Sequence, residues 1–235
     1  MCTCALNDSE ELISFGISDD WSFEQHAAKV SNLKSIYAYD YSVNFLQFLE
    51  KSTASIPKFL LRRLGVKAFL MALTLPIRYK MFFKGTFFHI ISRITNYENS
   101  SIDITIDKVF SRTNSQNIFL KMDIEGTEYK VISDLMKYHE RIEGLVIEFH
   151  DTSFLREKFV EALVQVAQGF DVVHVHGNNY DGSDRGDGLP HVLEISFVKK
   201  GKHDENEYIL AFPKSLLDQP NDVQQEDIAF KITFI

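Results

Sequence analysis

The sequence predicts an α/β fold in which helices cover both faces of a mostly parallel sheet. Short apolar segments with strand character alternate along the chain with segments whose apolar residues recur at helical spacing. Two β-prone segments, 170–177 and 191–198, are joined by a polar loop without a helix, which predicts an antiparallel hairpin at one edge of the sheet. The 235 residues are 45% hydrophobic, enough for one such domain with a sizeable core.

Each expected element has its own local pattern. Apolar and β-prone runs predict further strands at 11–18, 35–40, 118–124 and 144–150, whereas 86–94 is β-prone but ambiguous. Helical spacing predicts a helix that begins near Trp21 and others at 43–51, 104–111, 128–140 and 154–170. Apolar residues in the tail predict one more docked strand after Lys199 and another at 228–235. We expect a single domain over 1–235 with a C-terminal extension at about 199–235.

The segment 51–97 differs from the rest of the chain in charge. It contains nine Lys or Arg residues and no Asp or Glu, whereas the other 16 basic residues share the chain with all 33 acidic ones. Its apolar residues predict one or two short helices, broken near Gly65 and Pro76. We interpret 51–97 as a basic, apolar insertion. Its bases either pair with acids of the main body, cover an anionic ligand as a lid, or contact a membrane surface.

Overall composition narrows the function classes. A formal charge of −8 argues against a nucleic-acid-binding protein. The only cysteines, Cys2 and Cys4, predict neither a disulfide framework nor a structural zinc site. We find no pattern of a secretory leader, and the longest uncharged apolar run in the middle of the chain, 68–77, is too short for a membrane-spanning helix. A cytoplasmic location is therefore expected.

Ionisable residues follow two of the predicted strands at the point where each strand ends. Asp123 and Glu125 end the apolar run of the LKMDIEGTEY segment, and Glu148 and His150 end the run of GLVIEFH. Ligands of open α/β sheets bind at the carboxyl ends of the strands. Asp123 could also be a simple helix cap, but two strand ends with ionisable groups favour a functional site.

The first two strands indicate a site for a nucleoside-type ligand. Gly16 follows the first strand and would let a ligand approach the backbone closely. Asp40 ends the second strand, where a carboxylate can accept hydrogen bonds from a ribose diol or cap the next helix. The GxGxxG fingerprint of dinucleotide-binding proteins is absent.

The segment HVHGNNYDG is a third cluster of polar residues. His174 and His176 share one side of a strand, because side chains repeat every two residues. A divalent metal bound by these residues together with Asp123, Glu125 or His150 is an alternative that we do not favour. Asn178 and Asn179 could bind a polyhydroxylated acceptor or support a turn.

The segments SFGISDDWSFE, YAYD, LKMDIEGTEY and VIEFH together resemble the FkbM-type family of S-adenosylmethionine-dependent methyltransferases, over residues 11–198. The DIEGTEY ending is the most specific of these motifs. The resemblance implies the Rossmann-like class I methyltransferase fold, a seven-stranded sheet whose last strand is antiparallel. It also implies S-adenosylmethionine as cofactor and O-methylation of a hydroxyl, often on a sugar of a glycan.

The resemblance also implies roles for single residues. Phe15, Gly16 and Ile17 would approach the methionine part of the cofactor, with Glu24 near the same end, and Asp40 would hold the ribose hydroxyls. Asp123 would lie beside the methyl group and the acceptor. The residues that contact adenine cannot be assigned, because 51–97 occupies the expected place of the third strand.

A hydroxyl acceptor needs a group that takes its proton. We expect His150 to be this base, with Asp123 orienting it or the acceptor and His176 as the second candidate, while Glu125, Asn178 and Asn179 bind a small-molecule or glycan acceptor. Two other function classes stay open. The sparse glycine loop favours a binding module that kept the fold but lost catalysis, and the Asp, Glu and His residues allow a metal-dependent hydrolase, ranked last because no HExxH-type motif occurs.

Overall fold

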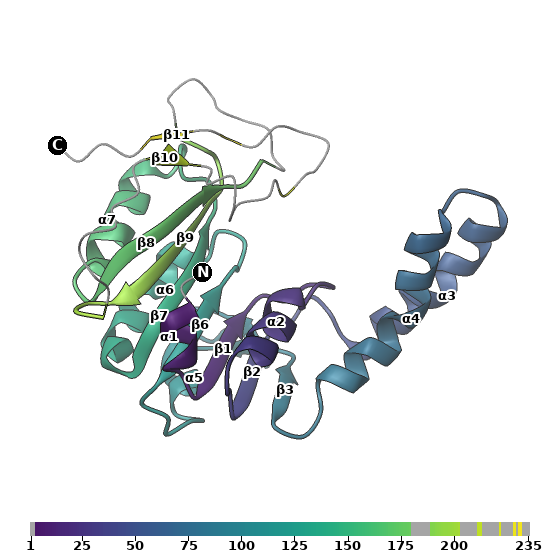
Figure 1. The fold of residues 1–235 in the computed structure, drawn as a ribbon, viewed down its shortest axis with the longest axis horizontal. Helices are drawn as coiled ribbons and strands as arrows, with labels where there is room; N and C mark the ends of the chain where they lie inside the picture. Colours follow the sequence, from purple (N-terminus) through teal and green to yellow (C-terminus); the bar gives the residue numbers. More distant parts are fainter. Residues whose placement is uncertain are drawn as a thin grey trace.

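The computed structural model describes residues 3–179, 189–202, 211–212, 221, 228 and 230–231. Its centre is a seven-stranded sheet with the strand order β3-β2-β1-β6-β7-β9-β8 (Figure 1). These strands are β1 (Glu11–Phe15), β2 (Ser35–Tyr39), β3 (Phe87–Ile90), β6 (Ile118–Met122), β7 (Ile142–Phe149), β8 (Phe170–Gly177) and β9 (Leu193–Lys199).

Neighbouring strands of the sheet are parallel except at β9. β9 runs antiparallel to both β7 and β8 and lies between them, so that the predicted hairpin forms one edge of the sheet. The other four pairings are parallel. The ambiguous segment 86–94 supplies β3, the third strand. The predicted fold class, Rossmann-like with a mostly parallel seven-stranded sheet, is confirmed.

Helices cover both faces of the sheet because successive residues of a strand point to opposite sides. Ile13 and Phe15 of β1 belong to the larger apolar cluster. This cluster also takes in α5 (Ile106–Phe110), α6 (Glu128–Leu135) and α7 (Arg156–Val166). Leu12 of β1 faces the other way, and packs in a second cluster with α1 (Thr3–Asn7) and α2 (Ser22–Val30). A 3₁₀ helix, η1 (Met136–Arg141), links α6 to β7.

A helical hairpin of α3 (Phe45–Leu60) and α4 (Val66–Phe82) projects from the sheet (Figure 1). The predicted break near Gly65 is confirmed, but the break near Pro76 is wrong, since α4 continues through Pro76. A proline removes one backbone donor. Here Leu75 and Tyr79, on either side of it, pack in a cluster with Trp21, and this packing holds the helix together. The extra element is therefore the hairpin, shorter than the segment 51–97.

The two ends of the chain differ from expectation. The short helix α1 was not predicted, yet its Leu6 is fully buried, and Cys4 is disulfide-bonded, which the cysteine count did not predict. Among its described residues, the tail adds no strand to the main sheet: β10 (Ala211–Phe212) and β11 (Phe230–Lys231) pair with each other as a separate two-stranded sheet. Residues 203–210, 229 and 232–235 of the predicted tail strands lie outside the described residues.

Two smaller observations complete the fold. A second short pair, β4 (Arg93–Ile94) and β5 (Asp103–Ile104), follows β3 at the carboxyl ends of the main strands. Among the described residues, no helix combines the length and the apolar character needed to cross a membrane.

Candidate active site

Gly16 brings the ends of β1 and β6 into direct backbone contact. Its φ is +81°, in the left-handed region that favours glycine. A Cβ at this position would lie 1.8 Å from the carbonyl oxygen of Asp123, so that no other residue fits without movement. The Asp123 N–H in turn donates to the carbonyl of Phe15 at 2.9 Å. Gly16 thus sets the distance between the predicted cofactor loop and the predicted catalytic acid.

The carboxylate of Asp40 holds the same loop from the side of β2. Its Oδ2 accepts from the N–H groups of Ile17 and Ser18 at 2.9 and 2.8 Å. Its Oδ1 accepts from the N–H and the hydroxyl of Ser42 at 2.7 and 2.6 Å. Burial alone would raise the pKa of Asp40, but these four donors outweigh it and hold the pKa below its usual range. Asp40 is therefore ionised and already fully hydrogen-bonded within the chain.

A cavity of about 300 Å³ opens beside this loop at the carboxyl ends of the strands. Gly16, Asp40 and Asp123 all line it, as do Tyr41 and Ile94. Phe15 and Ile17 do not line the cavity, and their side chains are buried in the core. An adjoining hollow shares Arg93, Ile94 and Thr127 with the cavity. The predicted neighbourhood of Gly16, Asp40 and Asp123 is thus present at one rim.

Glu128 organises the turn that follows β6. It is fully buried at the start of α6, and its Oε1 accepts from the N–H groups of Ile124 and Gly126, both at 3.2 Å. The same oxygen lies 3.0 Å from Nδ1 of His150. One buried carboxylate therefore fixes both the DIEGTEY turn and the orientation of the imidazole.

The other ring nitrogen of His150 faces carboxylates on three sides. Nε2 lies 3.4 Å from Glu125, 3.7 Å from Glu148 and 4.0 Å from Asp123. Burial would lower the pKa of His150, but the hydrogen bond to Glu128 and the surrounding negative charges raise it to about 9. At neutral pH the ring carries a proton, and a protonated imidazole is a poor general base.

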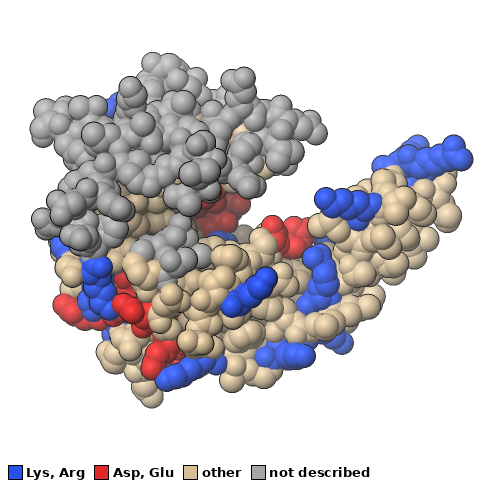
Figure 2. Space-filling model, viewed as in Figure 1, with Lys and Arg blue, Asp and Glu red and all other residues tan. Residues whose placement is uncertain are grey.

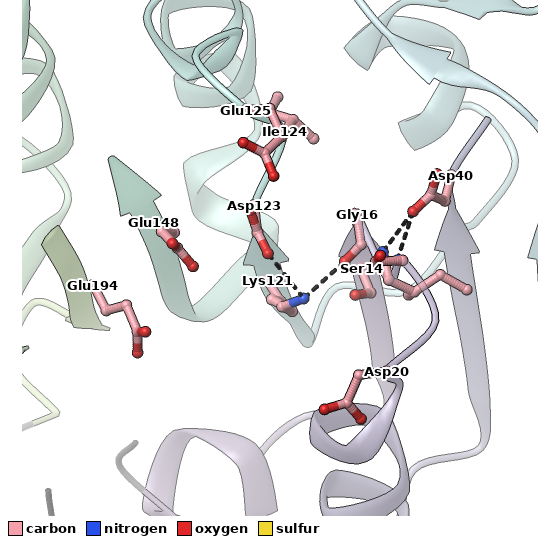
Figure 3. A network of polar contacts seen from close by, with 12 residues as sticks. Ser14, Gly16, Asp20, Asp40, Lys121, Asp123, Ile124, Glu125, Glu148 and Glu194 are labelled. Carbon is pink, nitrogen blue, oxygen red and sulfur yellow. Dashed lines mark hydrogen bonds and ion pairs between the residues drawn. The ribbon is translucent and has the colours of Figure 1, made fainter. Parts of the chain in front are cut away.

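The surroundings of Glu148 and Asp123 raise the pKa of these two carboxyl groups, whereas those of Asp40 lower its pKa. Burial, together with the charges of Asp123 and Glu194, raises the pKa of Glu148 to about 7. Burial also raises the pKa of Asp123, against the effect of Lys121 and His150. Asn178, predicted to bind substrate, donates from Nδ2 to Oε1 of Glu148 at 3.1 Å and so orients it. Figure 3 shows Glu148 and Asp123 side by side at the rim, on the opposite side of Gly16 from Asp40.

Lys121 connects the two halves of this rim. Its ammonium donates to the Gly16 carbonyl at 2.7 Å and lies 3.8 Å from Asp123 (Figure 3). It also lies 4.0 Å from Glu24, whose carboxylate accepts from Ser14 and is fully buried. Burial raises the pKa of Glu24. Glu24 does not line the cavity. Its buried carboxylate instead contacts Lys121 and Ser14, which lie next to the loop.

The remaining predicted site residues are His176, Asn179 and Glu125. His176 is buried on β8 beside Glu194 of β9, with 3.9 Å between its Nδ1 and the carboxylate. Burial would raise the pKa of Glu194, but hydrogen bonds from His176 and Asn221 lower it. Asn179 is also buried. Glu125 is the exposed member of the set, with a positive φ and 86% side-chain exposure, and it lines the cavity.

Three of these groups could hold a divalent cation. Asp123, Glu148 and His150 each offer one ligand atom, and the three atoms lie within 4.8 Å of one another. The contact from Nδ1 to Glu128 leaves Nε2 directed at the same space, an arrangement that is common for metal-binding histidines.

Three residues of the site were not predicted as such: Lys121, Glu128 and Tyr41. A lysine in the middle of an otherwise apolar strand is a detectable signal for Lys121, because a buried charge needs partners. Glu128 stood among the acids after the strand, but nothing in the spacing showed that it turns back toward His150. Tyr41 carries no sequence signal.

The sheet order, its antiparallel β9 and the cavity at the strand ends define the fold of class I, S-adenosylmethionine-dependent methyltransferases. No family model matches the sequence, and no curated protein matches it either. The FkbM resemblance therefore stays a prediction.

Solved structures resemble the chain at low identity. A precorrin-6y C5,15-methyltransferase from Geobacter metallireducens is 12% identical with a TM-score of 0.41, over 84% of this chain and 87% of that one. A protein from Pyrococcus horikoshii that is assigned as an RNA methyltransferase is 13% identical with a TM-score of 0.42, over 84% and 78%. A spermidine synthase from Thermotoga maritima is 10% identical with a TM-score of 0.40, over 84% and 56%. These likenesses define neither a family nor a substrate.

Proposed function

We propose that this chain is an S-adenosylmethionine-dependent O-methyltransferase that acts on a hydroxyl of a sugar or glycan-related acceptor in the cytoplasm. One observation carries the proposal. A cavity lined by Gly16, Asp40 and Asp123 opens at the strand ends, with Glu148 and His150 next to Asp123. The FkbM-type resemblance supplies the acceptor class.

The two halves of the rim suit the two reactants. When bound, S-adenosylmethionine supplies an electrophilic methyl group on a sulfonium. The glycine loop would approach it through backbone atoms, and Tyr41 and Ile94 offer an aromatic ring and an apolar surface for the adenine. Asp123, Glu125 and Glu148 would accept hydrogen bonds from several hydroxyls of one acceptor, as a polyhydroxylated sugar requires.

Glu148 is the group best suited to take the acceptor proton. Its pKa of about 7 leaves a large fraction ionised at neutral pH while keeping it basic enough to accept a proton. With the cofactor bound, the acceptor oxygen would take the methyl group and leave a neutral thioether, and Glu148 would take the hydroxyl proton. His150 would stay protonated and favour the charged form of Glu148. This assignment replaces the expectation that His150 is the base.

A methyl-transfer screen tests the proposal. Cofactor labelled in its methyl group is incubated with the protein and with sugar nucleotides or extracted cell glycans, and the label is located in the product. We expect base-stable label on a sugar oxygen in at least one acceptor class. Label found only on nitrogen, carbon or nucleic acid would contradict the sugar acceptor while leaving methyl transfer in place.

A second candidate function is a binding module that kept the fold without catalysis. The four internal donors on Asp40 favour it, because ribose hydroxyls would have to displace at least one of them. Titration calorimetry with S-adenosylmethionine separates the two. Measurable binding supports the enzyme, whereas no heat together with no thermal shift supports the non-catalytic module.

A further inference from the structure

The α3–α4 hairpin has a fixed base and a free outer part. At the base, Trp21 lies within ring-contact distance of Phe48 and Tyr79, which joins the hairpin to the loop after β1. Further out the two helices hold each other, with Phe59 stacked on Phe69 at 4.2 Å between ring centroids. The turn between them is the part furthest from the sheet (Figure 1). The hairpin is therefore anchored at its base and projects from the sheet at its outer end (Figure 1).

This outer surface is apolar along both helices. On α4, Val66, Leu70, Leu73, Ile77 and Met81 follow one another three or four residues apart and are all exposed, so they form a stripe along one face. On α3, Leu46, Leu49, Ile56 and Leu60 are exposed with compatible spacing. At the outer end, Leu60 is 74% and Val66 63% exposed. Contiguous exposed apolar surface of this kind marks an interaction site.

The same surface is strongly basic. The ten residues 58–67 around the turn contain four exposed bases and no acid: Lys58, Arg62, Arg63 and Lys67. Figure 2 shows Lys and Arg side chains gathered at the outer end of the hairpin, while the Asp and Glu side chains visible in that view lie on the main body. Within the described part of the chain, Lys51 near the base is the hairpin base that forms a salt bridge, with Asp19. Of the nine bases of 51–97 that were predicted to pair with acids, Lys51 and Arg93 do so in the described part of the chain, Arg93 with Asp103 at 2.7 Å, whereas the bases at the outer end of the hairpin form no such salt bridge there.

We propose that the outer end of the hairpin, 58–67, docks on an anionic lipid surface. Leu60, Leu61, Leu64 and Val66 would enter the boundary between headgroups and acyl chains, while the four bases contact acidic headgroups. Helices of 16 and 17 residues suit lying at the interface rather than crossing the bilayer.

Two other partners fit this surface less well. A nucleic acid would neutralise the bases but leave the aliphatic side chains in water, since stacking on bases needs aromatic side chains. A second copy of the hairpin would cover the aliphatic stripes but bring two clusters of like charge together. An anionic membrane satisfies both the apolar and the charged components.

Vesicle sedimentation tests the proposal with the full chain. The protein is mixed with phosphatidylcholine vesicles with and without phosphatidylserine, at low and high salt. We expect binding to the anionic vesicles that weakens as salt increases. Each base at the surface strengthens binding about fivefold, so that Arg62→Gly with Arg63→Gln should weaken it about 25-fold. Arg62 has a φ of +54°, which glycine adopts without strain, so the double variant is expected to fold.

A second pair tests the apolar part. Leu60→Asn with Val66→Asn removes two exposed aliphatic side chains without changing charge, and should weaken vesicle binding by at least about tenfold. The matched controls lie on α7, far from the hairpin along the sheet: Val160→Asn with Val164→Asn, and Arg156→Gln with Lys158→Gln. We expect both controls to bind like the original chain.

Three results would overturn the proposal. One is equal binding to neutral and anionic vesicles, and another is an unchanged affinity in both hairpin variants. The third is an absence of vesicle binding. This result overturns the proposal whether or not the chain instead forms a dimer that the double variant Leu60→Asn, Val66→Asn dissociates, and whether or not it binds RNA through the same bases. No readout here depends on methyl transfer, so the proposed function can fail without affecting this result.

Discussion

Asp40 and Glu148 lie at the same rim of the same sheet, yet the protein treats the two carboxyl groups in opposite ways. Asp40 receives four hydrogen bonds, three from backbone N–H groups and one from a hydroxyl, and its pKa lies below the usual range. Glu148 receives one from Asn178 and faces other acids, and its pKa rises to about 7. Burial opposes ionisation in both cases, so the difference comes from the donors around Asp40 and from the charges of Asp123 and Glu194 near Glu148.

This contrast assigns different work to the two halves of the rim. The half around Gly16 and Asp40 is built from backbone donors that fix a loop in place. The half around Glu148 and His150 is built from ionisable groups that share protons. The first half can position a ligand, whereas the second can exchange a proton with one.

The substitution Glu148→Gln removes the proposed proton acceptor, and we expect it to have the largest effect on turnover. Glutamine keeps the shape and can still accept from Asn178, but it cannot take a proton. We expect turnover to fall by about 10²–10⁴-fold while S-adenosylmethionine binding is unchanged. Single-turnover methyl transfer and calorimetry measure the two quantities. Glu161→Gln on α7 is the matched control, with no change expected because that side chain is exposed and does not line the cavity.

The substitution Gly16→Ala should disrupt the loop on the cofactor side of the rim. The new methyl group would meet the Asp123 carbonyl at 1.8 Å on a backbone with positive φ, so the ends of β1 and β6 must separate. We expect a loss of unfolding free energy on the order of 3 kcal/mol, with loss of cofactor binding. Gly65→Ala, with no atom within 4 Å of its new Cβ, should cost less than about 1 kcal/mol. Urea unfolding of both variants decides the matter, and equal costs would show that the close contact is unimportant.

The raised pKa of His150 predicts how stability depends on pH. The folded state binds this proton more tightly than the unfolded state, so the contribution is fully present below about pH 6.5 and is lost as pH rises through about 9. The shift sets an upper bound of roughly 3 kcal/mol. The thermal unfolding temperature should therefore decrease between about pH 7 and 9, and the His150→Gln variant should lack this decrease. Parallel curves for the two proteins would argue against a protonated His150.

Asp40→Asn tests the half of the rim around Gly16 and Asp40, and we expect it to have a smaller effect on stability than Gly16→Ala. An amide replaces one carboxylate oxygen with an NH₂ group that cannot accept from the loop N–H groups or from Ser42. We expect a cost of about 1–3 kcal/mol in stability and weaker cofactor binding. The pH at which turnover is half-maximal should stay near 7, because Glu148 sets it. A shift of that midpoint in Asp40→Asn would mean that the two halves are electrostatically coupled.

Metal removal should have the smallest effect. If proton transfer to Glu148 is sufficient, incubation with EDTA followed by desalting leaves the methyl-transfer rate unchanged. A rate that falls and then recovers with Mg²⁺ or Mn²⁺ would assign Asp123, Glu148 and His150 to a cation instead.

Much of the fold could be predicted from local patterns. The alternation of apolar strands and amphipathic helices was sufficient for the parallel sheet, and the polar loop after 177 was sufficient for the β8–β9 hairpin. The hairpin of α3 and α4 was harder, because Pro76 is a helix breaker by local rules and only the packing around Trp21 shows why α4 continues. The two short tail strands pair with each other as a separate sheet, although the edges at β8 and β3 could also pair with a strand, and no local pattern distinguishes the two arrangements.

By itself, the sequence determined which ionisable residues follow which strands, and therefore that Asp40, Asp123 and His150 meet at one rim, because parallel strands end on the same side of a sheet. Only the tertiary structure decided their protonation. The turn of Glu128 back toward His150, and the four donors around Asp40, come from residues brought together by folding, and a pKa depends on distances that no spacing along the chain records.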